Sequence, residues 1–427
     1  MRKLSSMVVG LLLVIGLCSI ATPAESADTP KKRYAPVEGG HFNQPRSTYL
    51  SQTRIERTIL GAINHSRKGE QIHISLYSFD RMNMAWALIH ARKRGVRVQI
   101  LINDHQVTRA MRKLKSVLGG NKRKKNFIHV CAHSCRSNHG KHHTKFYLFS
   151  KAGTAENVTM VGSANLTTNA IRNQWNDLLV LNDKPRVYNT YLKVFNEMRR
   201  DRNRRAIYQD FRISPHYRLG VMPFWRPSPS HDPIMKILDK VRCTGVAKGY
   251  GNNGRTIVRV SMHAWDNQRG AWLADKMRKL WARGCDVRML YGMAGAQVRS
   301  TWRVSTDRGK VPVRADGFDT DGDLLIDKYS HQKYLVISGR MLKKNVDRVY
   351  TGSSNWSASG LRGDEIIFQA DGRYIFKQWF NNFTFIWDHY SRPDGSSNLQ
   401  LPGERAARST LDRQAAAQAG GPAWEDD

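Results

Sequence analysis

Short apolar runs and amphipathic segments alternate along this chain of 427 residues, and one arrangement of them occurs twice. In residues 72–101 an apolar run is followed by a turn, a segment with apolar residues three and four positions apart, and a second apolar run. Residues 258–290 repeat this order. Continuous apolar runs are typical of parallel strands covered on both faces, and the middle spacing is that of an amphipathic helix. Each stretch is therefore predicted to form a βαβ unit.

The two stretches also share residues at matching positions. Gly95 and Gly284 follow the predicted helices, where a residue without a Cβ favours a helix C-terminus. Three pairs recur at one constant offset along the chain: Ser75 with Ser261, Asp80 with Asp266, and Trp86 with Trp272. Two copies are too few for a solenoid, which needs at least three. The sequence therefore predicts an α/β protein built from two similar halves, at residues 40–210 and 220–391.

The segments outside the halves differ in composition. Residues 211–233 are rich in proline and are predicted to connect the halves. Residues 392–427 have low hydrophobicity and few helix or strand signals, which predicts a disordered tail. Residues 1–27 have a positive start, an apolar run and then small residues, as a secretory signal peptide does. We therefore expect a secreted protein.

A polar pattern occurs once in each half. "HHTKFYLFS" begins at residue 142 and "HQKYLVISG" begins at residue 331, and each is followed by Gly-Ser-x-Asn. The His-x-Lys pattern is thus repeated at nearly the same offset as the pairs of the βαβ units. The repeated polar residues are His143, Lys145, Ser163 and Asn165 in the first half and His331, Lys333, Ser353 and Asn355 in the second.

These residue types together suit the cleavage of a phosphodiester. Histidine can act as a nucleophile or transfer a proton near neutral pH. Lysine neutralises the phosphate charge, and asparagine and serine offer neutral hydrogen-bond donors. Two such sets, facing each other across a pseudo-twofold axis, would place one histidine on each side of a phosphorus atom. One histidine could attack in line while the other protonates the leaving oxygen.

With these motifs the chain resembles the phospholipase D superfamily, whose mark is HxKxxxxD followed by GSxN, usually present twice. The resemblance covers most of residues 43–391 and implies a duplicated α/β/α sandwich whose halves share one active site. It also implies a covalent phosphohistidine, which water or an alcohol resolves. His143 would be the nucleophile and His331 the general acid and base, although the sequence leaves the reverse open. The paired lysines and asparagines would bind phosphate oxygens with support from Ser163 and Ser353, and no metal or other cofactor would be needed.

The chain departs from the family pattern at one position in each half. Ser150 and Ser338 stand where the family usually has aspartate, seven positions after each histidine. The spacing from each histidine to its Gly-Ser is also long. This position is generally considered structural in the family, so the match still includes the histidine, lysine and asparagine of each motif.

Each Gly-Ser-x-Asn motif is followed by an acidic residue that enters an apolar strand. Asp177 follows the first motif, and Glu365, beside Asp364, follows the second. An unpaired charge there would be costly, and a nucleophilic histidine needs its second ring nitrogen held by a partner. Asp177 and Glu365 are therefore expected to support the two histidines, with a solvated acid at the start of a strand as the alternative.

Four cysteines remain beyond the predicted signal peptide, and an even number in an oxidising compartment favours two disulfides. The pairing that we favour is Cys131–Cys135 and Cys243–Cys285. A zinc site of Cys131, Cys135, His133 and His139 is the alternative for the first pair. The acidic segment 316–327 is interpreted as a solvated turn, because its glycine is misplaced for an EF-hand calcium loop.

The composition indicates an anionic substrate but does not distinguish a phospholipid from a nucleic acid. The chain has 69 Lys and Arg against 35 Asp and Glu, a formal net charge of +34. A phospholipid at a peripheral membrane surface fits export and aromatic residues expected in rim loops, with the core as the alternative place for most of them. These residues are Phe224, Trp225, Trp265, Trp302 and Trp356. Nucleic acid fits the basic runs at 108–127 and 199–205. We favour a phospholipase D, with a nuclease and an inactive anion-binding protein as alternatives, and expect a monomer because one chain carries both motifs.

Overall fold

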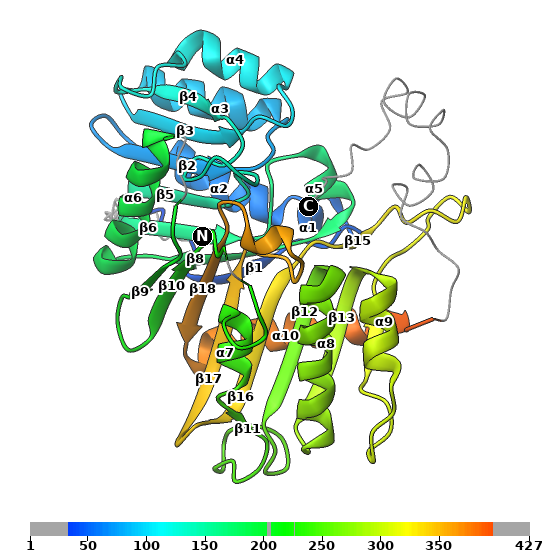
Figure 1. Cartoon of the computed structure of the whole chain (residues 1–427). Helices are drawn as coiled ribbons and strands as arrows, with labels where there is room; N and C mark the ends of the chain where they lie inside the picture. The colour runs from blue at the N-terminus through cyan, green and yellow to red at the C-terminus, as the bar shows by residue number, and fades with distance from the viewer. Residues whose placement is uncertain (1–32, 203–205, 226, 396–427) are drawn as a thin grey trace, which may run out of the picture. The chain divides into compact units, whose positions relative to one another are not determined.

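The computed structural model describes residues 33–202, 206–225 and 227–395 (Figure 1). The expected signal peptide at 1–27 and residues 396–427 of the expected tail lie outside these described residues. Among the described residues no helix is both long and apolar enough to cross a membrane.

The first half is built on a seven-stranded sheet of order β1-β8-β6-β5-β2-β3-β4. Its strands are β1 (Gly39–Phe42), β2 (Gln71–Leu76), β3 (Arg97–Asn103), β4 (Phe127–Cys131), β5 (Phe146–Ala152), β6 (Ala155–Gly162) and β8 (Asp177–Leu181). The strands β2, β3 and β4 are parallel, and the other pairings are antiparallel. The helices of this half are α1 (Tyr49–Gln52), α2 (Arg54–Asn64), α3 (Met82–Lys93), α4 (Arg109–Leu118), α5 (Thr168–Arg172) and α6 (Pro185–Arg200).

The second half repeats this order in a larger sheet, β19-β14-β13-β12-β16-β17-β18-β10-β9, with β11 paired to β16. The strands are β9 (Gln209–Arg212), β10 (Tyr217–Val221), β11 (Val241–Arg242), β12 (Ile257–Trp265), β13 (Asp286–Ala294), β14 (Val313–Ala315), β16 (Lys333–Met341), β17 (Lys344–Gly352), β18 (Ile366–Asp371) and β19 (Arg392–Pro393). The helices are α7 (Pro233–Leu238), α8 (Asn267–Ala282), α9 (Ala296–Arg303), the 3-10 turn η1 (Ser359–Leu361) and α10 (Arg373–His389). A separate two-stranded sheet joins β7 (Gln174–Trp175) to β15 (Tyr329–Ser330).

The two predicted βαβ units are confirmed as β2-α3-β3 and β12-α8-β13, each with its strands parallel. Gly95 and Gly284 follow these helices with φ of 92° and 94°, a left-handed conformation that glycine adopts without strain. The strand β5 follows the first His-x-Lys motif and β16 begins at the lysine of the second, and each lies beside the first strand of its unit. The duplicated α/β fold is therefore confirmed.

The helices α6 and α10 join the halves through one apolar core. Residues of α6, α10 and both sheets belong to the same buried cluster. Tyr191 of α6 contacts Phe368 of β18, with ring centroids 5.7 Å apart, and Trp379 of α10 contacts Phe42 of β1 at 5.1 Å. Each half thus covers part of the other half's sheet, which fixes the position of one motif relative to the other.

The structure corrects two predicted boundaries. The segment 211–233 is not a simple connection, because the β9–β10 hairpin in it pairs with β18 at the edge of the second sheet. The tail does not begin at residue 392, because β19 pairs with β14. In both places a few backbone hydrogen bonds order a segment whose composition resembles that of a loop.

Candidate active site

The backbone at each of the two histidines is hydrogen-bonded to a segment of the other half. The N–H of His143 donates to the carbonyl of Asp364 at 3.0 Å, and the N–H of His331 donates to the carbonyl of Trp175 at 2.9 Å. Each histidine of one half is therefore attached to the segment that follows the Gly-Ser-x-Asn motif of the other half. Each motif histidine is thus positioned by backbone of both halves.

Glu365 holds the ring of His143. Nδ1 of His143 lies 2.7 Å from Oε1 of Glu365, and Ser353 donates a hydrogen bond to Oε2 of the same carboxylate. A carboxylate accepts, so Nδ1 donates and Nε2 is the acceptor nitrogen of the ring. The predicted support of a histidine by Glu365 is present, and it reaches across the halves.

Asn176 holds the ring of His331 in the equivalent way. Nδ1 of His331 lies 2.9 Å from Oδ1 of Asn176, and Ser163 donates to this oxygen at 2.9 Å. The Asn176 amide nitrogen donates to the Ala170 carbonyl at 3.2 Å, which keeps its oxygen turned toward the histidine. The site is thus asymmetric, because a carboxylate backs His143 and a neutral amide backs His331.

The prediction that Asp177 supports a histidine is wrong. Oδ2 of Asp177 accepts hydrogen bonds from Thr351 and from the indole of Trp379. Burial raises the pKa of this carboxyl group. Asn176 and Glu365 occupy equivalent positions, because each follows its Gly-Ser-x-Asn motif at nearly the same distance along the chain. This spacing is the sequence signal for Asn176, although its amide side chain is not the carboxylate that usually supports a histidine.

The two lysines of the motifs turn back toward their histidines. Nζ of Lys145 lies 2.5 Å from Nε2 of His143 and 3.0 Å from the His143 carbonyl. Nζ of Lys333 donates to the carbonyl of His331 at 3.0 Å. Because an ammonium group only donates, Nε2 of His143 is the acceptor and carries a lone pair.

The two asparagines occupy matching positions. Oδ1 of Asn165 accepts from the N–H of Ser78, and Oδ1 of Asn355 accepts from the N–H of Ala264, both at 3.3 Å. The two serines, lysines, asparagines and histidines of the motifs are all buried. The oxygen of each amide thus faces a backbone N–H, which fixes the orientation of the side chain.

An aromatic ring contacts each histidine. Tyr77 lies against His143, and His263 lies against His331, both with ring centroids 4.8 Å apart. Tyr77 is stacked in turn on His105, and Lys141 donates to its hydroxyl at 3.3 Å. Tyr77 and His263 are separated by the same offset as the paired residues of the βαβ units. The motifs alone gave no indication of this second layer.

A cavity of about 1060 Å³ opens onto His143 and Glu365. Lys141 and Arg362, which are both exposed, and the ring of Trp225 lie on its wall. The other lining residues are His139, Gly140, Asn267, Ala358, Ser359 and Gly363. Cations on the wall together with His143 suit an anionic substrate whose phosphate reaches inward.

Three aromatic residues expected in rim loops belong instead to the core. Trp265 packs against Trp302 and Trp356, with ring centroids 5.6 Å and 4.3 Å apart, and all three are buried. Phe224 and Trp225 are partly exposed. Indole rings supply more apolar contact area than most side chains, and these three fill the space around α8 and α9.

The two serines at the usual aspartate positions have structural contacts. Ser150 accepts from the N–H of Gln71 at 2.8 Å, and Ser338 accepts from the N–H of Gly251 at 2.9 Å. Ser338 also donates to Asp347 at 2.6 Å. Both serines cap backbone groups that an aspartate could also cap, so their presence leaves the motif residues in place.

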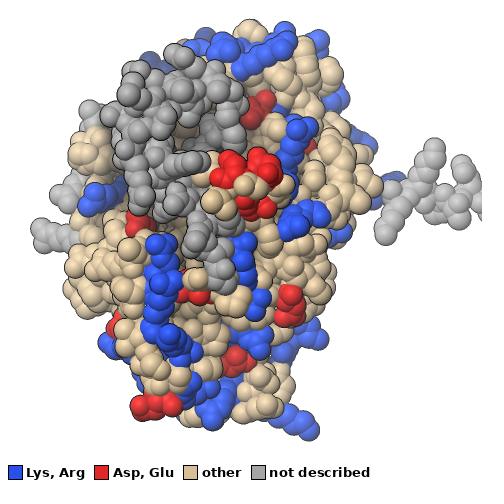
Figure 2. Space-filling view, turned by 90° about the vertical axis from the view of Figure 1, so that its right-hand side faces the viewer, with Lys and Arg blue, Asp and Glu red and all other residues tan. Residues whose placement is uncertain are grey.

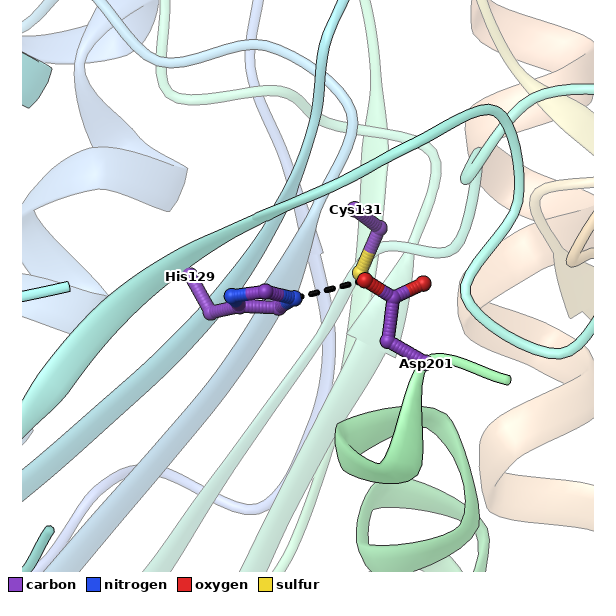
Figure 3. A group of neighbouring side chains, drawn as sticks. All are labelled: His129, Cys131 and Asp201. Atoms are coloured by element: carbon purple, nitrogen blue, oxygen red, sulfur yellow. Dashed lines mark hydrogen bonds and ion pairs between the residues drawn. The ribbon is translucent and has the colours of Figure 1, made fainter. Parts of the chain in front are cut away.

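Both predicted disulfides are present, Cys131–Cys135 and Cys243–Cys285. The first bond leaves neither sulfur as a thiolate, so the alternative zinc site with His133 and His139 is wrong. Figure 3 shows Cys131 beside His129 and Asp201, and a hydrogen bond of 2.7 Å joins Nε2 of His129 to Oδ2 of Asp201. The disulfide closes the turn from Cys131 to Cys135. The N–H of Cys135 in turn donates to the buried carboxylate of Asp364 at 2.6 Å, which ties the loop before His143 to the second half.

A family model for the PLD-like domain of cardiolipin synthase matches residues 59–199 and 252–387, which is more than half of the chain. The chain belongs to this phospholipase D-like family. The two matched segments coincide with the two halves of the fold and contain all the motif residues. No curated protein sequence matches the chain.

Solved structures share the fold at low sequence identity. Polyphosphate kinase from Porphyromonas gingivalis has a TM-score of 0.52 and 11% identity, and the match covers 88% of this chain but only 56% of that one. Phosphatidylserine synthase from Haemophilus influenzae Rd KW20 has a TM-score of 0.51 and 11% identity, with 86% and 92% covered. At this identity the likeness concerns the fold alone.

Proposed function

We propose that the protein is a secreted phosphodiesterase of the phospholipase D type, which hydrolyses phospholipids such as phosphatidylcholine to phosphatidate and a free head group. The observation that carries this proposal is the exchanged support of the two histidines, His143 on Glu365 and His331 on Asn176. It gives the histidine of each His-Lys-Asn set a supporting residue from the other half.

In the proposed mechanism Nε2 of His143 attacks phosphorus, and the bond from phosphorus to the leaving oxygen breaks as His331 protonates that oxygen. Water then attacks phosphorus, the bond from phosphorus to Nε2 of His143 breaks, and His331 takes the proton that the water loses. Lys145, Lys333, Asn165 and Asn355 hold the non-bridging oxygens and stabilise the charge that develops on them. The lysines supply this charge, so the chemistry needs no metal.

The asymmetry of the site supports His143 as the nucleophile. A phosphorylated imidazole that keeps its Nδ1 proton is cationic, and the Glu365 carboxylate at 2.7 Å would stabilise that charge. The acid and base residue must instead gain and lose a proton in each cycle. The neutral amide of Asn176 holds the ring of His331 without favouring its cationic form as strongly.

The size and lining of the catalytic cavity favour a phospholipid as the substrate. Its volume of about 1060 Å³ is at the upper end for sites that hold small organic molecules. Lys141 and Arg362 could contact the phosphate, and Trp225 could pack against the head group. The disulfides are compatible with secretion.

A nuclease is the second candidate, because the fold brings the two basic runs together. Lys122 of the first run donates to the carbonyl of Arg200 in the second at 3.0 Å. Arg202 lies with residues 132–134 on the wall of another cavity, just before the loop that carries His143. A polyanion could follow this path. Charge alone does not mark a path, because Figure 2 shows lysine and arginine side chains spread widely over the face in view.

The test offers phosphatidylcholine vesicles and plasmid DNA in parallel to the purified protein with a chelator present. Choline release and strand cutting are followed for wild type, for His143→Ala, and for His216→Ala as a control at an exposed histidine on the β9–β10 hairpin. We expect wild type and the His216→Ala control to release choline, and His143→Ala to release none. DNA cutting without choline release would assign the nuclease, and activity in His143→Ala would overturn the mechanism.

A further inference from the structure

We propose that a second cavity, of about 410 Å³, is a binding site for a phosphomonoester attached to a sugar or nucleoside ring. It lies between α7 and the strands β9, β10, β17 and β18. Figure 1 shows α7 over this part of the second sheet. The proposal goes beyond the phosphodiesterase activity and concerns a different set of residues.

The floor of this cavity is one face of the sheet. Ile367 and Gln369 alternate along β18 and so point to the same side. Gly220 pairs with Ile367 on the neighbouring strand. A Cβ at Gly220 would lie 2.7 Å from the hydroxyl of Tyr208, so a side chain there would displace the tyrosine that lines the cavity.

Two arginines on the wall are held in fixed orientations. Arg218 makes a two-pronged ion pair with Asp210, with Nε to Oδ1 at 2.5 Å. Arg348 makes a similar pair with Asp371, with Nε to Oδ1 at 2.6 Å. Such paired guanidinium groups have lost most of their freedom before a ligand arrives, which favours binding of an anion.

Two lysines complete the basic part of the wall. Within the described part of the chain, neither Lys236 nor Lys240 makes a side-chain hydrogen bond or ion pair. The pKa of Lys240 is lowered by burial and by the charges of Arg218 and Arg348. The cations that line this cavity are Arg212, Arg218, Lys236, Lys240 and Arg348, and the carboxylates of Asp210 and Asp371 compensate two of them. An anion would relieve this excess of positive charge.

The remaining wall is aromatic, and it decides the class of ligand. Tyr208, Tyr217, Phe224 and Tyr350 line the cavity, and the rings of Tyr208 and Phe224 meet edge to face with centroids 5.6 Å apart. A phosphate ion alone would leave these surfaces in water. A ring attached to the phosphate would pack against them, and a volume of 410 Å³ is within the range of sites for small organic molecules.

The second cavity is separate from the catalytic one. The two cavities share no lining residue. Phe224 lines the second cavity, whereas its neighbour in sequence, Trp225, lines the catalytic one. The N–H of Phe224 donates to the carbonyl of Leu361 at 2.7 Å, which fixes this division. Ligand binding can therefore be measured with the catalytic histidine removed.

The test is calorimetric titration of the His143→Ala protein with AMP, ribose 5-phosphate and inorganic phosphate. We expect one AMP to bind per chain, more tightly than inorganic phosphate. The variant Lys236→Gln/Lys240→Gln should bind at least tenfold more weakly. The control Lys343→Gln/Lys344→Gln makes the same change of charge at exposed residues of the β16–β17 turn and should bind as its parent does. Ribose 5-phosphate binding as tightly as AMP would identify a sugar phosphate as the minimal ligand.

Equal affinity of the pocket variant and the control would overturn the proposal, as would the absence of binding by every probe. Loss of binding on removing His143 from the wild-type protein would assign the ligand to the catalytic cavity instead. A second readout is acetylation of lysines followed by mass spectrometry. AMP should protect Lys240 from the reagent and leave Lys343 unprotected, and equal labelling with and without AMP would also contradict the site.

Discussion

Asp316 is a buried carboxyl group beside the segment that leads to His331, and its environment makes the stability of the protein depend on pH. Its Oδ1 accepts a hydrogen bond of 3.1 Å from the N–H of Ser330, whereas Oδ2 has no partner among the described residues. Burial raises its pKa to about 7, against a smaller lowering by the hydrogen bonds of Ser330 and the charge of Arg392. We predict that the free energy of unfolding of wild type falls as pH rises, and that Asp316→Asn abolishes this part of the fall.

The sign and size follow from linkage. The ordinary pKa of the group is 3.8, so between about pH 4 and pH 7 the folded state binds more protons than the unfolded chain. The free energy of unfolding therefore falls as pH rises through this window. At 1.36 kcal/mol per pKa unit, a rise in pKa from 3.8 to about 7 corresponds to about 4 kcal/mol. Asparagine does not ionise, and its oxygen can still accept from Ser330.

Urea unfolding followed by tryptophan fluorescence, with the disulfides intact, measures this effect from pH 4 to pH 8. The free energy of unfolding of Asp316→Asn minus that of wild type should rise by about 4 kcal/mol over this range. Asp323→Asn, at an exposed aspartate a few residues along, is the matched control and should follow wild type. If the profiles of Asp316→Asn and wild type are parallel, the carboxyl group does not titrate in this window and the reasoning fails.

Three further predictions concern the site and its frame. Glu365→Gln should slow formation of the phosphohistidine about 10-fold to 100-fold in rapid-quench measurements, because it removes a charge-assisted hydrogen bond worth about 1.5–3 kcal/mol; an unchanged rate would reject a role for this carboxylate. Ser338→Ala should lower the free energy of unfolding by about 1–2 kcal/mol and leave activity intact, since it loses contacts with Gly251 and Asp347 only; inactivation without loss of stability would contradict a structural role. Replacing Cys243 and Cys285 by alanine should cost about 4 kcal/mol, and replacing Cys131 and Cys135 about 2 kcal/mol, because the bonds close loops of 42 and 4 residues; equal costs in urea unfolding would disagree with this account.

The duplicated fold was predictable because its signals are local and repeated. Apolar strand and helix periodicity defined both βαβ units, and Gly95 and Gly284 marked where their helices end. The even number of cysteines favoured two disulfides, and the pairing of Cys131 with Cys135 is present. These features need no knowledge of how the halves meet.

What escaped prediction depends on contacts between distant segments. Asn176 was passed over for its neighbour Asp177, because a charged residue looked the better partner for a histidine, yet the strand turns Asp177 toward Thr351 and Trp379. The β9–β10 hairpin is ordered by pairing with β18, far along the chain, which a proline-rich sequence does not reveal. Trp265, Trp302 and Trp356 were expected in loops, whereas packing between helices and sheet buries them.

The central claim, that His143 is the nucleophile and His331 the acid and base, is tested most directly by trapping the intermediate. Bis(p-nitrophenyl) phosphate has a leaving group that needs no protonation, so His331→Ala should still form the intermediate but resolve it slowly. Alkaline quenching and peptide mass spectrometry should then find a p-nitrophenyl phosphate adduct on His143, accompanied by a burst of p-nitrophenol, and none in His143→Ala. An adduct on His331 in the His143→Ala protein would reverse the two roles, and no adduct on either histidine would contradict the covalent mechanism.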